Sequence, residues 1–250
     1  MPLTGSLRSY WGASRAPRYS LLFALPLLLS YELLAFTLSG DAILGIRNGA
    51  DVLLKSLFIG FGGRQGLIVF GALLLGTGTV LVVRDLRRGG GLDFRVFGLM
   101  AVEAVVYALG FGIVVGTLTG ILLGALVPPA APPVALQAGG MGLATQLMIS
   151  LGAGIYEELL FRVLLVGALA WLARRVFVWR PAAVGAFATV LGALIFSAFH
   201  YVGPYGDRFE MPSFTFRTLA GLVFSAMYLG RGFGITAWTH ALYDIFIAAR

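Results

Sequence analysis

The stretch Ile155-Tyr-Glu-Glu-Leu-Leu-Phe-Arg162 decides the fold class, because it places two carboxylates and a guanidinium inside a long apolar tract. One charged side chain at the centre of a bilayer costs roughly 2.5–3.5 kcal/mol on insertion scales, so this cluster needs a structural or chemical reason. On a helix, Glu158 and Arg162 are four residues apart and share a face, so they can form an ion pair. Glu157 is rotated by about 100° from Glu158 and is less well placed to be neutralised. We therefore expect the arginine to hold one carboxylate while the other stays free for chemistry.

The composition predicts an all-α protein, a polytopic transmembrane helix bundle with about seven to eight spans. Of the 250 residues, 59% are hydrophobic and 12% are charged, whereas soluble domains carry about 25% charged residues. The net charge of +7 could indicate a nucleic-acid partner, but the arginines stand at the ends of apolar runs. We therefore expect a lipid bilayer and no nucleic acid as partner. The chain has no cysteine, which excludes disulfides, thiol nucleophiles and thiolate metal sites.

Seven apolar runs are predicted to span the membrane, at about residues 19–38, 66–83, 96–127, 142–172, 182–199, 213–229 and 233–248. The third run is longer than one perpendicular span, so it is tilted, broken at its glycines, or projects from the membrane. Residues 41–64 mix charged and apolar side chains and predict an amphipathic segment on the outer face, ending in a glycine-rich turn at residues 60–63. The prolines within residues 128–133 predict a stiff external loop.

The distribution of basic residues predicts the orientation of the chain. A cytoplasmic N-terminus places these arginines of the connections inside: Arg84, Arg87, Arg88, Arg95, Arg174, Arg175, Arg180 and Arg231. It leaves a smaller set at or near the outside: Arg47, Lys55, Arg64, Arg208, Arg217 and Arg250. We expect an integral protein of the bacterial plasma membrane with its N-terminus in the cytoplasm.

The only two histidines of the chain lie near the ends of predicted spans. His200 follows Phe196 at i,i+4, and His240 precedes Asp244 at the same spacing, so each pair shares a helix face. Taken singly, a histidine at a helix end is at least as often an interfacial residue as a catalyst. Together with Glu157, however, the histidines place polar groups on three spans, and each group is costly in a bilayer unless it faces the bundle interior.

Two further glutamates, Glu32 and Glu103, stand singly in predicted spans. A single embedded glutamate often bonds a neighbouring helix or lines a water cavity, and we expect that role for both. The polar groups with candidate chemistry therefore all lie after residue 150.

The motifs of this region resemble those of the CPBP family, intramembrane proteases that include type II CAAX prenyl endopeptidases and bacteriocin-processing or immunity proteins (Abi family). They are, in order, Glu157-Glu158-x-x-x-Arg162, Phe196-x-x-x-His200 and His240-x-x-x-Asp244. The resemblance covers roughly residues 140–248. It implies a catalytic transmembrane core at residues 140–250, preceded by an N-terminal transmembrane region at residues 1–139, both within one integral domain.

The resemblance also implies a role for each site residue. Glu157 would act as general base on a water that His200 binds and polarises, and Glu158 and Arg162 would support the site. His240 would stabilise the oxyanion or orient the scissile carbonyl. The implied substrate is a membrane-associated peptide or protein tail, and no cofactor is expected.

Asp244 departs from the family pattern, because many members carry asparagine at this position. An ionised carboxylate cannot donate a hydrogen bond to an oxyanion, so Asp244 is protonated, orients His240, or ligates something. The last option keeps open a metal-dependent protease in which Glu157, His200, His240 and Asp244 bind a divalent ion such as zinc. The chain has no HExxH helix, and we place the metal-free mechanism first.

Two functions of other classes stay open at this stage. The first is a non-proteolytic immunity or scaffold protein that binds a peptide partner, although a binding role would not need a base together with a water-polarising imidazole. The second is a small transporter with a proton relay, which the lack of repeat symmetry in the hydropathy disfavours.

The predicted spans raise one geometric difficulty for the site. At 1.5 Å per residue, Glu157 stands roughly 22 Å from the inner end of its span, whereas His240 stands only about 10–15 Å from the inner end of its own. Either the boundaries of the last two spans are displaced by several residues, or a helix is broken, or the two residues do not meet.

Overall fold

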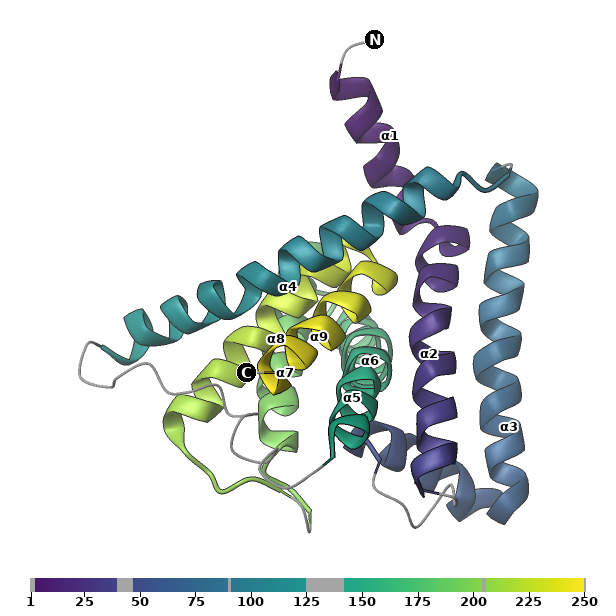
Figure 1. Cartoon of the computed structure of the whole chain (residues 1–250). Coiled ribbons are helices and arrows are strands. Elements are labelled where there is room, and N and C mark those ends of the chain that lie inside the picture. The colour runs from purple at the N-terminus through teal and green to yellow at the C-terminus, as the bar shows by residue number, and fades with distance from the viewer. Residues whose placement is uncertain (1–2, 40–46, 90, 125–141, 204–205, 250) are drawn as a thin grey trace.

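The computed structural model describes residues 3–39, 47–89, 91–124, 142–203 and 206–249, without the side chains of residues 3–8 and 39. These residues form helices and no strand, which confirms the predicted all-α bundle (Figure 1). The helices are α1 (Leu3–Arg15), α2 (Pro17–Ser39), α3 (Gly49–Gly89), α4 (Phe94–Leu123), α5 (Leu143–Gly152), the π-helix η2 (Ala153–Val166), α6 (Gly167–Val176), α7 (Pro181–Phe199), α8 (Met211–Arg231) and α9 (Phe233–Ala248). The predicted loop at residues 128–133 and the predicted boundary between residues 139 and 140 lie outside the described residues.

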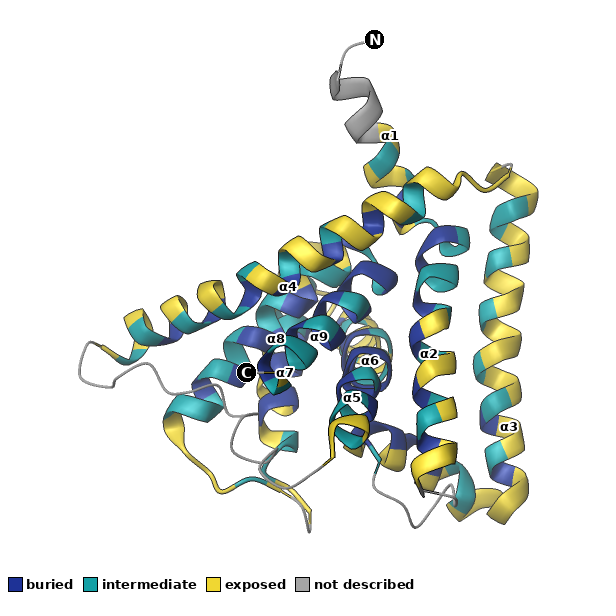
Figure 2. Ribbon diagram, in the orientation of Figure 1, coloured by how far each residue is buried: buried dark blue, intermediate teal, exposed yellow. Residues whose placement is uncertain are grey.

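Four helices are long and apolar enough to cross a membrane, namely α2, α3, α4 and α7. Their outer faces carry many exposed apolar side chains, among them Ile68, Ile113 and Ile121, and Figure 2 shows α3 and α4 exposed along most of their length. Exposed apolar surface of this extent fits contact with lipid rather than water, and the protein is an integral membrane protein. The other predicted spans also form helices, but α9, for example, has 16 residues and measures about 24 Å, less than the ~30 Å hydrocarbon core.

The third predicted span is one continuous helix. α4 runs through 30 residues without a break and crosses the bundle obliquely in Figure 1. Of the three alternatives that the sequence left open, a break at the glycines is therefore excluded, and the oblique course of α4 favours the tilted helix.

The segment that precedes the second predicted span differs from its prediction. The expected turn at residues 60–63 corresponds to a kink at Gly63, whose φ of 57° is accessible to glycine without strain. The residues before the kink form a helix with one face inside the protein, where Asp51 and Lys55 are buried, and one face exposed, with Val52, Leu53 and Leu57. Asp51 and Lys55 pair with each other, and they also contact Tyr31 and Glu32 of α2.

The tract that carries the two adjacent glutamates is one rod made of α5, η2 and α6. Its central 14 residues are π-helical, with i→i+5 hydrogen bonding, where the sequence predicted an α-helix. π-Helical turns are rare and occur often at functional sites. No residue type in this stretch distinguished the two geometries beforehand.

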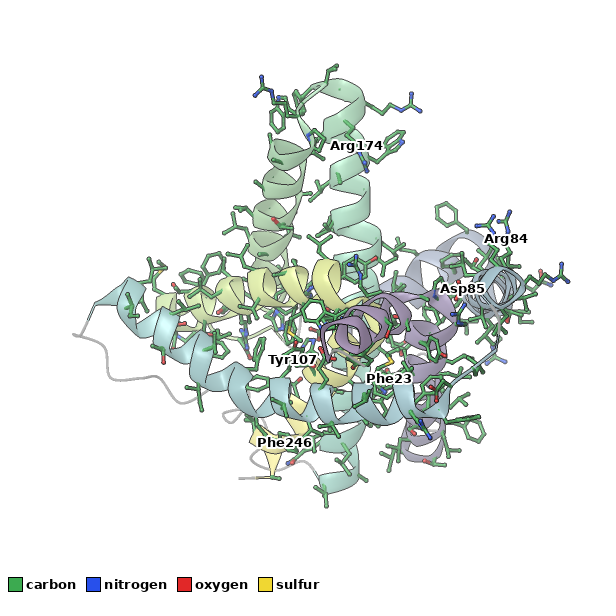
Figure 3. The ribbon with its side chains drawn as sticks, turned by 90° about the horizontal axis from the view of Figure 1, so that it is seen from above. Phe23, Arg84, Asp85, Tyr107, Arg174 and Phe246 are labelled. Carbon is green, nitrogen blue, oxygen red and sulfur yellow. The ribbon has the colours of Figure 1, made fainter. Side chains whose placement is uncertain are left out.

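The geometric difficulty of the predicted spans is resolved by the packing of this rod. α9 packs against α5 and η2, whereas α6 packs against α7. Figure 3 shows the hairpin of α6 and α7, with Arg174 near its tip, projecting away from the rest of the protein. Glu157 and His240 therefore belong to one site, because the part of the rod that carries Glu157 packs against α9 whereas its α6 end leaves with α7.

A glycine permits the close contact between α9 and η2. A Cβ atom on Gly154 would lie 2.4 Å from the carbonyl oxygen of Ala237 and 2.7 Å from the Cβ of Ala241. Both distances are below van der Waals contact, so any larger residue would push the two helices apart. The contact brings His240 to Glu158.

Candidate active site

The structure brings the six predicted site residues together from three segments. η2 carries Glu157, Glu158 and Arg162, the end of α7 carries His200, and α9 carries His240 and Asp244. Four of the six, Glu157, Glu158, Arg162 and His240, are buried, while His200 and Asp244 are partly exposed. The site is therefore closed on the side of Glu158 and accessible on the side of His200.

Glu158 is the carboxylate that the arginine holds. Its Oε2 lies 3.2 Å from the Nε of Arg162, and its Oε1 lies 2.7 Å from the Nδ1 of His240. A carboxylate accepts hydrogen bonds, so Nδ1 of His240 carries the proton and donates it to this bond. The other ring nitrogen, Nε2, then points toward Asp244, 3.8 Å from its Oδ2. Glu158 thus fixes both the orientation and the tautomer of His240.

Glu157 is the carboxylate that stays free. Its Oε1 accepts a hydrogen bond of 2.8 Å from the side-chain amide of Asn48. Its Oε2 has no hydrogen-bond partner among the described residues and lies 3.9 Å from the Nε2 of His200. This separation is too long for a direct hydrogen bond and is suited to a bridging water.

His200 is oriented by its own helix. Its Nδ1 lies 2.9 Å from the carbonyl oxygen of Phe196, one turn earlier, as the i,i+4 spacing predicted. A carbonyl can only accept, so Nδ1 carries the proton and Nε2 is left with its lone pair facing Glu157. The segment after His200 is also held, because Asp207 donates its backbone N–H to the His200 carbonyl and pairs with Arg217 through its carboxylate.

Asn48 is a site residue that the sequence analysis missed. It precedes α3, where its Oδ1 accepts a 2.9 Å hydrogen bond from the backbone N–H of Ala50 as an N-cap. Because Oδ1 is used for the cap, the NH₂ group must face Glu157. Asn48 is the only asparagine in the chain and stands before the capping-type sequence Gly-Ala-Asp51, which is the signal that could have marked it.

A second polar network holds Asn48 in place. The hydroxyl of Tyr31 lies 3.3 Å from the backbone nitrogen of Asn48 and donates a 2.6 Å bond to Asp51. Asp51 pairs with Lys55 at 2.7 Å, and Lys55 pairs with Glu32 at 2.8 Å. The predicted role of Glu32 as a bond to neighbouring helices is confirmed by this pair.

Aromatic rings cover the remaining faces of the cluster. The guanidinium of Arg162 lies 4.4 Å from the ring centre of Phe196 and 5.3 Å from that of Phe224. Phe224 also stacks on the imidazole of His240 at 4.3 Å between ring centres. Rings on both groups exclude water from the Glu158–Arg162–His240 side, where the cation–π contacts stabilise a charge that would otherwise be costly to bury.

The residues named as possible metal ligands do not form a ligand set in this arrangement. Within the described residues, no group of three or more His, Asp or Glu side chains is placed to hold a metal ion. Nδ1 of each histidine is engaged, by Glu158 in one case and by a backbone carbonyl in the other, so Nε2 is the nitrogen through which each ring would have to bind a metal. No step of the mechanism below is therefore routed through a metal.

Comparison with known families identifies the part of the chain that contains the site. Residues 139–246 match the model of the family described as type II CAAX prenyl endopeptidase Rce1-like. This match confirms the resemblance to the CPBP proteases and covers all six predicted site residues, but not Asn48. Comparisons with curated proteins and with solved structures give no match.

Proposed function

We propose that this membrane protein hydrolyses a peptide bond with a water activated by Glu157. The proposal starts from the match of residues 139–246 to the family described as type II CAAX prenyl endopeptidase Rce1-like. The family match supports a peptidase. The observation that carries the glutamate mechanism is the asymmetry of Glu157, with one oxygen bonded to Asn48 and the other unpartnered among the described residues, 3.9 Å from His200.

The first step is the activation of water between Glu157 and His200. A water in this position donates one hydrogen bond to Oε2 of Glu157 and the other to Nε2 of His200, and its lone pair then faces the substrate. Glu157 accepts a proton as the water oxygen attacks the carbonyl carbon of the scissile peptide bond. General-base catalysis of this kind contributes about 10²–10⁴ in rate.

The second step is the stabilisation of the oxyanion formed on the carbonyl oxygen. Nδ1 of His240 is committed to Glu158, so only its Nε2 can donate to the oxyanion, which requires a proton on both nitrogens. The carboxylates of Glu158 and Asp244 flank the ring and stabilise this imidazolium form by their charge. We therefore assign Asp244 the role of supporting His240, one of the three options that the sequence left open.

The reaction is completed by proton transfer to the leaving group. The C–N bond of the tetrahedral intermediate breaks as Glu157 returns its proton to the departing nitrogen. The products are a peptide with a new carboxylate and a peptide with a new amine, and Glu157 is again ionised. Arg162 remains paired with Glu158 throughout and compensates its buried charge.

The substrate reaches the site on the side of His200, whose side chain is 24% exposed, whereas that of Glu158 is 0% exposed. A membrane-associated peptide or C-terminal tail is the substrate class that the family implies. We place the N-terminus in the cytoplasm, because most arginines of the connections then lie inside, and Lys55 and Arg217 of the predicted outer set are buried in the protein.

The proposal is tested by a proteolysis assay on the purified protein in detergent with a pool of membrane-anchored C-terminal tails. Wild type is compared with Glu157→Ala and His200→Ala, and each is also assayed with a strong chelator. Cleavage that is lost in both variants but kept with chelator supports the glutamate mechanism, provided that both variants elute and unfold as wild type does. Retained turnover in either folded variant would contradict the assigned roles.

The same assay distinguishes the alternatives. Loss of wild-type cleavage with chelator, restored by zinc, would favour the metal-dependent protease with Glu157, His200, His240 and Asp244 as ligands. If no tail is cleaved but one co-purifies with the protein, and binds Glu157→Ala equally well, the immunity or scaffold function replaces the peptidase.

A further inference from the structure

A large apolar cavity lies outside the catalytic cluster. It has a volume of about 850 Å³, is partly open to the surroundings, and is lined by α2, α3, η2 and the junction of α8 and α9. Its wall is almost entirely apolar and includes Leu25, Leu74, Leu159 and Phe233. The volume falls within the range of about 300–1,000 Å³ that proteins use to bind one small ligand. Nothing in the proposed peptidase mechanism uses this space.

The shape of the cavity suits an extended chain. Along α3 the lining residues run from Phe70 to Val83, which corresponds to about 20 Å at 1.5 Å per residue. One leaflet of the hydrocarbon core is about 15 Å thick, so the cavity is long enough for an acyl chain that runs the depth of one leaflet. Phe58 and Phe70 lie at one end, and Arg15 lines the wall at the other.

The end at Arg15 is strongly basic. Arg84 and Arg88 follow Leu81 by three and seven residues, so they continue the face of α3 that lines the cavity. Both are exposed, as are Arg15 and Arg87. Figure 3 looks down on this end and labels Arg84 beside Asp85.

Little negative charge opposes these arginines. Asp85 is paired with Arg18, and Asp93 caps the start of α4 by accepting from the backbone of Arg95. The other carboxylate near this end, Glu103, is paired with Arg231, so the described carboxylates here are already engaged. An apolar cavity with an uncompensated cationic end is complementary to an amphiphile with an anionic head.

We propose that this cavity binds one anionic phospholipid of the bilayer. An acyl chain lies between α2 and α3, and the phosphate is held at the end formed by Arg15, Arg84 and Arg88. Each arginine near a membrane surface strengthens attraction to anionic lipid by roughly fivefold. An uncharged chain would use the apolar wall alone and gain nothing from the arginines. The site is separate from the peptidase centre, and its occupancy can be measured without any substrate.

The test uses the full-length protein, purified in detergent, delipidated, and titrated with phosphatidylglycerol or phosphatidylcholine of identical acyl chains. Native mass spectrometry reports the lipid-bound fraction. We expect one phosphatidylglycerol to bind at least about tenfold more tightly than phosphatidylcholine. Arg15→Gln/Arg84→Gln should lower the affinity for phosphatidylglycerol to that for phosphatidylcholine. The matched control is Arg174→Gln/Arg175→Gln at the tip of the α6–α7 hairpin, which should leave the preference unchanged.

A second pair of variants tests the cavity itself. Gly78 lines it, and a Cβ there meets no atom within 4 Å, so Gly78→Phe fills the space without a clash. Gly76 is equally unobstructed but does not line the cavity, which makes Gly76→Phe the control for folding. Gly78→Phe should weaken both lipids by tenfold or more, and Gly76→Phe should weaken neither.

Three results would overturn the proposal. The first is equal affinity for the two lipids, and the second is undiminished binding to Gly78→Phe. The third is an equal loss in the Arg174→Gln/Arg175→Gln control, which would indicate attraction to any basic surface. Displacement of phosphatidylglycerol by an equal concentration of an uncharged isoprenoid alcohol would assign the cavity to apolar chains of any kind and would equally reject it.

Discussion

Two of the charged clusters inside this bundle treat their carboxylates in opposite ways. In the first, both oxygens of Glu103 accept hydrogen bonds. Oε1 accepts from Nε of Arg231, and Oε2 accepts from Nη2 of Arg231 at 2.8 Å and from the hydroxyl of Tyr10. In the second, Glu157 has one oxygen bonded to Asn48 and one without a hydrogen bond among the described residues. A saturated carboxylate holds helices together, and an unsaturated one beside an imidazole keeps its basicity available for chemistry.

The comparison confirms the expected structural role of Glu103 and separates it from that of Glu157. Arg231 stands at the end of α8 and reaches Glu103 on α4, and its Nη2 also donates a 3.0 Å hydrogen bond to the hydroxyl of Ser14 on α1. The pair therefore ties three helices together. Glu157, by contrast, joins η2 to a single amide and faces the accessible side of the site. Substitutions in the two clusters should accordingly change different measured quantities.

The largest expected effect is that of Glu157→Gln on catalysis. The amide keeps the size of the side chain but cannot accept a proton from water, so the cleavage rate should fall by about 10²–10⁴. The unfolding temperature should stay close to that of wild type, because no buried ion pair is broken. The measurements are initial cleavage rates and thermal unfolding on the same preparation. If Glu157→Gln also lowered the unfolding temperature substantially, the distinction between the two clusters would be removed.

The next effect is that of His240→Ala, which removes the donor to the oxyanion. A single oxyanion donor contributes about 10²–10³ in rate, so kcat should fall by this factor while KM changes little. A change confined to KM would instead indicate that His240 binds the substrate. The double variant with Glu157→Gln should lose little more than Glu157→Gln alone, since the two residues serve one transition state.

The third effect is one of stability and belongs to the other cluster. Glu103→Ala leaves the buried guanidinium of Arg231 unpaired, which should lower the free energy of unfolding by about 3–5 kcal/mol. The folded fraction should keep its specific activity. Glu103→Met/Arg231→Met removes both charges and should recover most of the loss. Denaturant unfolding with activity per folded molecule checks both statements, and a loss of specific activity would link this cluster to catalysis.

The smallest effect is expected for Asn48→Ala, because Asn48 positions Glu157 without contacting substrate. Loss of one hydrogen bond to a charged group should lower kcat by roughly tenfold or more and leave KM unchanged. Asn48→Asp preserves the N-cap but places a second carboxylate beside that of Glu157. Its kcat should therefore be lower than that of Asn48→Ala, and its pH–rate profile should be displaced. A matching loss for both variants, with an unchanged profile, would reduce Asn48 to a helix cap.

The sequence already predicted the six polar residues that the structure gathers around Glu157 and Glu158, together with their spacing along the chain. The ion pair of Glu158 and Arg162 and the orientation of His200 by its own helix both follow from i,i+4 geometry, which is local and survives the change to a π-helix. The bond of Asn48 to Glu157 could not be predicted, because 109 residues separate the two positions and nothing local relates them.

By itself, the sequence determined that this is an all-α membrane protein with carboxylates, histidines and an arginine in its interior. Composition and periodicity are sufficient for that, since charge in an apolar tract is tolerated only where helices bury it together. The tertiary structure alone decided which carboxylate is saturated and which is free. It did so through contacts between distant helices, such as the approach of α9 to η2 at Gly154, that no single segment encodes. It also decided that residues 49–55 turn their polar side chains inward and that α6 projects beyond α9, because packing, not local pattern, sets the level at which helices meet.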